Sequence, residues 1–133
     1  LTWRARIEFF IGDNTSSIEH MRSFAAKAEK DADYFIEDHR SKREFKNKDS
    51  QDWVYSRGSA AGDALLALVR LQLRTEHASD AEDSMTRFAN LRSRCDAALS
   101  DADKRSPHYR LFFESVDKDA EEVRNQLIRV KGK

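Results

Sequence analysis

Hydrophobic residues recur at alternating steps of three and four along four long segments of this chain, which places them on one face of an α-helix. The predicted helices cover about residues 16–47, 51–77, 80–103 and 107–131. The links between them are only a few residues long, which favours antiparallel packing of consecutive helices. We therefore expect an all-α fold, an up-down-up-down antiparallel four-helix bundle. Residues 1–133 should form a single domain, with 1–12 as a short N-terminal helical arm.

Two of the predicted helices begin with clear start signals. Ser16 and Glu19 stand at the spacing of a capping box, in which two side chains satisfy backbone amides of the first turn. Ser106 followed by Pro107 provides an N-cap and a proline at the first helical position, where its missing N–H costs nothing. The first and fourth helices should therefore begin close to these residues.

The second segment carries two adjoining hydrophobic seams, so we expect it to be the most buried helix. The seams contain Val54, Gly58, Ala61, Leu65, Leu68 and Gln72, and beside them Gly62, Leu66, Val69 and Leu73. Glycine costs about 1 kcal/mol relative to alanine inside a helix. Gly58 and Gly62 therefore indicate positions where a neighbouring helix approaches closely.

The apolar run in this segment does not predict a membrane helix or a nucleotide site. It is uncharged only from Ala64 to Val69, between Asp63 and Arg70. Crossing a bilayer takes about 20 apolar residues, so we expect no membrane insertion. The G-x-x-x-G spacing also lacks the Lys and Ser or Thr that a P-loop needs for phosphate.

The N-terminal sequence TWRARIEFFI is compatible with two structures. Trp3, Ile7 and Phe10 fit a short helix folded against the bundle, whereas the alternation of apolar and polar residues fits a strand. No second strand-like segment is present in the sequence, so a strand would need another chain as its pairing partner. We expect the short helix.

The composition narrows the classes of function. Lys plus Arg and Asp plus Glu each number 24, so the zero net charge supplies no overall attraction to nucleic acid or anionic lipid. The single cysteine, Cys95, needs no disulfide partner and favours a reducing, cytoplasmic location. It lies on the seam of the third helix, where we interpret it as a small buried hydrophobe.

Histidine and cysteine are too few and too scattered for a metal site. Structural zinc needs four paired ligands, and di-iron bundles need Glu-x-x-His, but none of the four histidines follows an acidic residue at that spacing. We therefore expect no metal and no cofactor. His39, on the seam of the first helix, is interpreted as a core or helix-end residue with satisfied ring nitrogens.

Arg70 and His77 form an Arg-x6-His pair near the end of the second predicted helix. This pattern resembles the active-site motif of the small helical HEPN ribonucleases, in which the Arg and the His act together on an RNA phosphate. The resemblance rests on these two residues and implies a ribonuclease as one alternative. Cations near a helix C-terminus also favour the helix dipole, which explains the same residues structurally.

Positive charge is expected at one end of the bundle. Antiparallel packing brings the end of the first helix near the start of the fourth, so that Arg43, Lys46, Lys104 and Arg105 form a basic pole. Such a pole suits the phosphates of RNA or DNA, which makes a nucleic-acid-associated protein a second alternative.

No set of residues converges on a catalytic arrangement, so we do not expect an enzyme. Our interpretation is a non-enzymatic helical module that binds another protein or associates with its own copy. The apolar N-terminal arm and the glycine face of the second helix are its expected contact regions. The candidate partner-binding residues are Trp3, Ile7, Phe10, Gly58 and Gly62.

Overall fold

The structure, a computed structural model, describes residues 14–42 and 50–132. Over these residues it is all-helical, with short turns and no strand, which confirms the predicted fold class. The helices are α2 (Asn14–Lys42), α3 (Ser50–Arg74), α4 (Ala78–Ala98), α5 (Asp101–Arg105) and α6 (Pro107–Lys131). The predicted arm, 1–12, and the end of the first predicted helix, 43–47, lie outside the described residues.

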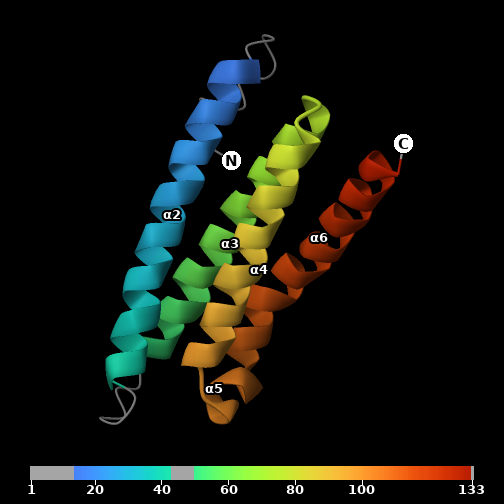
Figure 1. The fold of residues 1–133 in the computed structure, drawn as a ribbon. Coiled ribbons are helices and arrows are strands. Elements are labelled where there is room, and N and C mark those ends of the chain that lie inside the picture. Colours follow the sequence, from blue (N-terminus) through green and yellow to red (C-terminus); the bar gives the residue numbers. More distant parts are fainter. Residues whose placement is uncertain (1–13, 43–49, 133) are drawn as a thin grey trace.

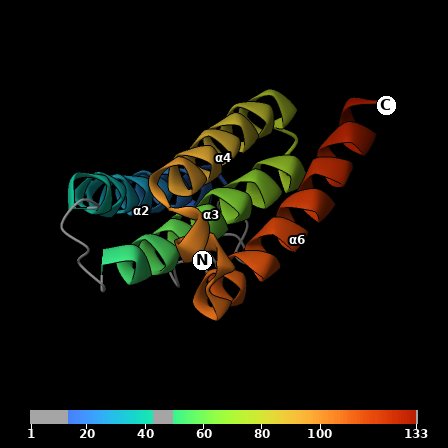
Figure 2. The same cartoon turned by 90° about the horizontal axis from the view of Figure 1, so that it is seen from below.

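Helix α3 is the central helix of the molecule. It packs against α2, α4 and α6, whereas α2 and α6 make no substantial contact with each other over the described residues. Figure 1 shows the long helices running in alternate directions along the chain, and Figure 2 shows the other three arranged around α3. As a result α3 and α6 run in the same direction and pack directly against each other.

Burial follows the predicted seams. In α3, 14 of the 25 residues are buried, more than in any other described helix, as its two adjoining seams predict. One hydrophobic cluster joins α2, α3, α4 and α6. Its largest fully buried hydrophobic side chains include Tyr55, Phe113, Met21, Leu65, Leu66, Leu68 and Leu91. The buried polar residue Gln72 is satisfied because its Oε1 accepts a hydrogen bond of 2.8 Å from the Ser84 hydroxyl.

The helix predicted over 80–103 is wrong beyond Ala98, because the chain forms two helices there. Leu99 takes an extended backbone conformation after α4 ends. Ser100 then caps α5 in a reciprocal capping box: its Oγ accepts from the Asp103 amide at 3.1 Å, and the Asp103 carboxylate accepts from the Ser100 amide at 3.0 Å. These two hydrogen bonds satisfy amides that a new helix start leaves unpaired.

The other helix boundaries are closer to the prediction. Helix α3 ends at Arg74, before the predicted residue 77, and Glu76 has a φ of 63°, a left-handed conformation that interrupts a right-handed helix. Helix α6 has the predicted bounds, and the Ser106 hydroxyl accepts a hydrogen bond of 3.2 Å from the His108 amide. The N-cap predicted at Ser106 is therefore confirmed.

Candidate functional site

The structure places only some of the predicted site residues. Helix α5 carries Lys104 and Arg105, beside the start of α6. The Lys104 ammonium lies 4.0 Å from the carboxylate of Asp101, and Arg105 is exposed. The remaining residues of the predicted arm and basic pole lie outside the described residues: Trp3, Ile7, Phe10, Arg43 and Lys46.

Gly58 and Gly62 are buried between α3 and two helices of the same chain. A Cβ on Gly58 would lie 2.7 Å from the Sγ of Cys95 on α4, and a Cβ on Gly62 would lie 3.1 Å from a methyl carbon of Val116 on α6. Both glycines therefore permit close helix packing, as the sequence predicts. Because these neighbours belong to the same chain, neither glycine lies on the outer surface of the described residues.

A buried polar cluster joins the end of α2 to the start of α3 and to α5. The Nδ1 of His39 lies 2.6 Å from the hydroxyl of Ser50, and its Nε2 lies 3.1 Å from the Oδ2 of Asp103. The phenol of Tyr55 donates a hydrogen bond of 2.5 Å to the backbone oxygen of Asp103. Both ring nitrogens of His39 thus have partners, which agrees with its interpretation as a satisfied core residue.

Acyl-transfer catalysts also use a Ser–His–Asp series, in which the histidine activates the serine hydroxyl. Ser50 and His39 are both buried, however, and a nucleophilic hydroxyl must be reachable by its substrate. The cluster therefore connects three helices rather than offering a catalytic hydroxyl.

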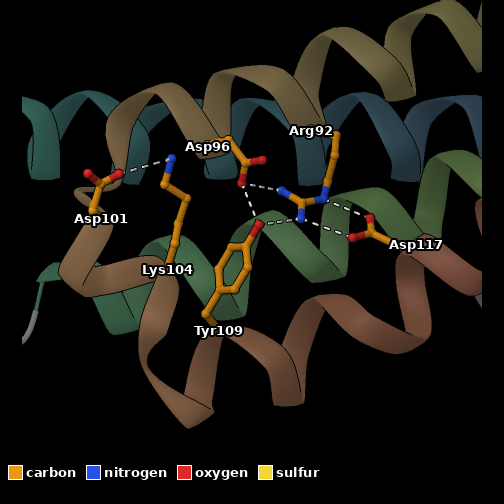
Figure 3. A network of polar contacts seen from close by, with 6 residues as sticks. All are labelled: Arg92, Asp96, Asp101, Lys104, Tyr109 and Asp117. Atoms are coloured by element: carbon orange, nitrogen blue, oxygen red, sulfur yellow. Dashed lines mark hydrogen bonds and ion pairs between the residues drawn. The ribbon is translucent and has the colours of Figure 1, made fainter.

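A second polar cluster, the Arg92 network, ties α4 to α6 (Figure 3). The Arg92 guanidinium donates to both carboxylate oxygens of Asp117, at 2.8 and 3.0 Å, and to Asp96 at 2.6 Å. It also donates to the Tyr109 phenol at 2.8 Å, and that phenol donates to Asp96 at 2.8 Å. The guanidinium carbon lies 4.1 Å from the centre of the Phe113 ring, a cation–π contact.

Every polar group of the Arg92 network has a partner within the network itself. Burial by itself lowers the pKa of Arg92, but hydrogen bonds to the two aspartates and to Tyr109 raise it above its ordinary value. Burial raises the pKa of Tyr109 as well. Neither group is poised to exchange a proton near neutral pH, so the network acts as a structural connection between helices.

The surroundings of Cys95, Arg70 and His77 give each of these residues a structural role. Cys95 is a fully buried free thiol, as predicted, and burial raises its pKa to about 12. Arg70 lies 3.8 Å from carboxylates of α6, which disfavour an RNA phosphate at that place. His77 lies in the turn after α3, where its Nδ1 is 2.9 Å from the Thr75 hydroxyl.

An exposed aromatic surface crosses from α2 to α3. Phe35 and Trp53 stack with ring centres 5.0 Å apart and planes 13° apart, and the Arg57 guanidinium lies 5.7 and 5.5 Å from their centres. Tyr34 meets the edge of Phe35 at 5.1 Å. Trp53 is 46% exposed and Tyr34 is 66% exposed. We call these four residues, Tyr34, Phe35, Trp53 and Arg57, the aromatic–arginine patch.

The sequence did not reveal this patch, because its residues come together only when α2 and α3 are placed in register. Phe35 lies in the second half of α2, and Trp53 stands one turn into α3. A usable signal was the adjacent pair Tyr34 and Phe35 near the end of one amphipathic helix, with Trp53 near the start of the next. Antiparallel packing brings those two regions together.

Among residues 14–42 and 50–132, no group of three or more His, Cys, Asp or Glu side chains is arranged to hold a metal ion. None of the helices in this part of the chain is both long enough and apolar enough to cross a membrane. No protein-family model, curated protein or solved structure matches the chain.

Proposed function

We propose that this chain is a non-enzymatic helical module for protein–protein interaction and that the aromatic–arginine patch is its contact surface. The observation that carries the proposal is the stack of Trp53 on Phe35 with Arg57 beside both rings, on a surface where Trp53 and Tyr34 remain exposed. The few residues that dominate the binding energy of a protein interface are enriched in Trp, Tyr and Arg.

The rings of the patch already contact one another within the single chain. Its rings contact one another across two packed helices, so they lose little side-chain freedom when a partner covers them. Burial of the exposed parts of Trp53 and Tyr34 then contributes to affinity with a small entropic cost.

We propose a second copy of the same chain as the partner. The patch contains both a cation, Arg57, and exposed rings, so two copies related by a two-fold axis can each place the arginine over the partner's aromatic side chains. The chain carries 24 cationic and 24 anionic residues, so two copies do not repel each other through net charge.

Light scattering after size-exclusion chromatography tests this proposal. The single-chain mass is 15.4 kDa, and the mass of the wild-type protein should rise toward twice that value as its concentration increases. Concentrations from roughly 1 μM to 1 mM cover association free energies of about −8 to −4 kcal/mol. A Trp53→Ser, Tyr34→Ser double variant should keep the single-chain mass over that range.

Ile128→Ser is the matched control, because Ile128 is 64% exposed on α6 and lies outside the patch. This variant should associate as the wild type does. A wild-type protein that keeps the single-chain mass throughout would exclude a second copy as the partner. Association that survives the double variant would exclude the patch as the contact surface.

Three finer expectations are also proposals. The N-terminal arm contributes Trp3, Ile7 and Phe10 to the contact surface, which removal of residues 1–12 tests in the same experiment.

The four long helices form an up-down-up-down antiparallel bundle, and the alternating directions in Figure 1 support this topology. The protein is cytoplasmic, since its one cysteine, Cys95, is a buried free thiol and needs no oxidising compartment.

A further inference from the structure

A hollow lies between α5 and the N-terminal half of α6, where it shares Tyr109 and Asp117 with the Arg92 network of Figure 3. We call it the basic hollow, because its lining includes four cations: Lys104, Arg105, Arg110 and Lys118. Two of these cations were predicted from the sequence as part of a basic pole. The other two come from α6, where helical spacing places them on the side that lines the hollow.

The charge of the basic hollow is positive after its acidic residues are taken into account. Of its two carboxylates, Glu114 and Asp117, the second is bound at both oxygens by Arg92, at 2.8 and 3.0 Å. Lys104 lies 4.0 Å from the exposed carboxylate of Asp101, a weak pair. The other three cations have no carboxylate within ion-pair distance among the described residues.

The basic hollow also presents an apolar side chain. Leu111 is 73% exposed, the largest exposure among the large hydrophobic residues of the described chain. It lies on α6 within the same lining as the four cations, close to Pro107. An apolar side chain in the same lining as four cations matches a ligand that carries both a hydrophobic side chain and carboxylates.

We infer that the basic hollow binds an acidic segment of a partner protein, with an apolar side chain of that segment packed on Leu111 and its carboxylates facing the four cations. The chemistry favours a peptide over a single-stranded nucleic acid, because base recognition needs ring faces for stacking. The two rings that line the hollow do not supply them: Phe113 is buried, and Arg92 lies 5.4 Å from the centre of the Tyr109 ring.

This inference rests on the proposed function as a protein-binding module, but it concerns a surface separate from the aromatic–arginine patch. The test is fluorescence anisotropy with three labelled probes at about 50 mM salt, where exposed charge pairs are weakly screened. One probe is a peptide of about 14 residues, roughly four helical turns, with Leu at every third or fourth position and Glu elsewhere. The second replaces each Leu by Ser, and the third is a single-stranded RNA of the same length.

The Leu–Glu peptide should bind the wild-type protein about tenfold more tightly than the Ser–Glu peptide, because it buries a leucine. Leu111→Ser should lower affinity for the Leu–Glu peptide by about tenfold and leave the Ser–Glu peptide unchanged. An Arg105→Gln, Arg110→Gln double variant should bind both peptides about fivefold more weakly, since each exposed charge pair contributes modestly to the binding free energy. Ile128→Ser, which removes an exposed side chain elsewhere on α6, should change neither affinity.

Three results would overturn the inference: no binding of the Leu–Glu peptide at about 1 mM, equal losses in Leu111→Ser and Ile128→Ser, or tighter binding of the RNA than of either peptide. The third result would assign the basic hollow to nucleic acid. None of them affects the light-scattering test, because Trp53 and Tyr34 lie on α3 and α2 and are not among the residues that line the hollow.

Discussion

Gly58 on α3 packs directly against Cys95 on α4, and this contact is possible only because glycine has no side chain. A Cβ at residue 58 would stand 2.7 Å from the Cys95 Sγ and 3.2 Å from a ring carbon of Phe113. Both neighbours are buried, so neither can move aside without disturbing the core. The spacing between these two helices is therefore set by a glycine and a small thiol.

Gly58→Ala should destabilise the fold although alanine is the better helix former. Overpacking a core costs about 1–3 kcal/mol, and the gain in helix propensity offsets about 1 kcal/mol of that. Urea unfolding of the wild type, Gly58→Ala, Cys95→Ala and the double variant completes a mutant cycle. The Gly58→Ala cost should fall by about 1 kcal/mol or more when Cys95 is alanine, and strict additivity of the two changes would contradict the contact.

The Arg92 network should contribute more to the free energy of unfolding than an exposed ion pair does. Arg92→Met keeps an unbranched side chain but removes the charged hydrogen bonds to Asp96 and Asp117, so we expect a loss of about 2 kcal/mol in the free energy of unfolding. Arg94→Met on the same helix is the control, because Arg94 is exposed and pairs with Asp33 across to α2. That control should lose less than about 1 kcal/mol. Similar losses in both variants would show that the network adds nothing beyond surface pairing.

Cys95 should be unreactive in the folded protein. Burial raises the pKa of its thiol to about 12, so almost no thiolate is present at pH 8, and the sulfur is also inaccessible. A colorimetric disulfide reagent added at about pH 8 should react only as fast as the chain opens, and at once in denaturant. Rapid reaction of one thiol per native chain would contradict the burial of this helix interface.

Tyr55 should make the fold sensitive to alkaline pH. Burial, and then the negative charge of Asp103, raise its pKa to about 12 from an ordinary value of 10.0. Between those values the folded chain retains a proton that the unfolded chain has lost, so stability should decrease as pH rises through that window. The slope from one such group is at most about 1.4 kcal/mol per pH unit. In urea unfolding measured from about pH 9 to 11.5, Tyr55→Phe should show a shallower decrease than the wild type, and equal slopes would rule out this contribution.

Local sequence signals located the helices well where caps and seams agreed. Ser106 and Pro107 marked the start of α6, and the two seams of α3 identified the most buried helix. The break between α4 and α5 was missed although Ser100 and Asp103 stand at capping-box spacing, because the surrounding residues continue the apolar repeat. A periodic pattern alone does not show whether a capping residue ends one helix and starts another or lies inside a continuous helix.

The side-chain clusters depended on information that the sequence does not contain. The chain contains 24 acidic residues, and the sequence does not show which of them pairs with Arg92. Asp117 is its partner because α6 lies beside α4. The same holds for Trp53 and Phe35, whose stacking requires the register of two helices. Lys104 and Arg105 were predicted as cations of the basic pole because they are adjacent in the sequence. Only the structure shows that Arg110 and Lys118 line the same hollow.

The central position of α3 has a consequence for how the molecule opens. Since α2 and α6 each pack on α3 and make no substantial contact with each other over the described residues, either one can detach while the other keeps its own interface. Such an architecture permits subglobal unfolding in separate cooperative units. Native-state hydrogen exchange should then find the amides of α2 and α6 opening independently, with those of α3 exchanging last because every opening that exposes α3 fully must release all its neighbours.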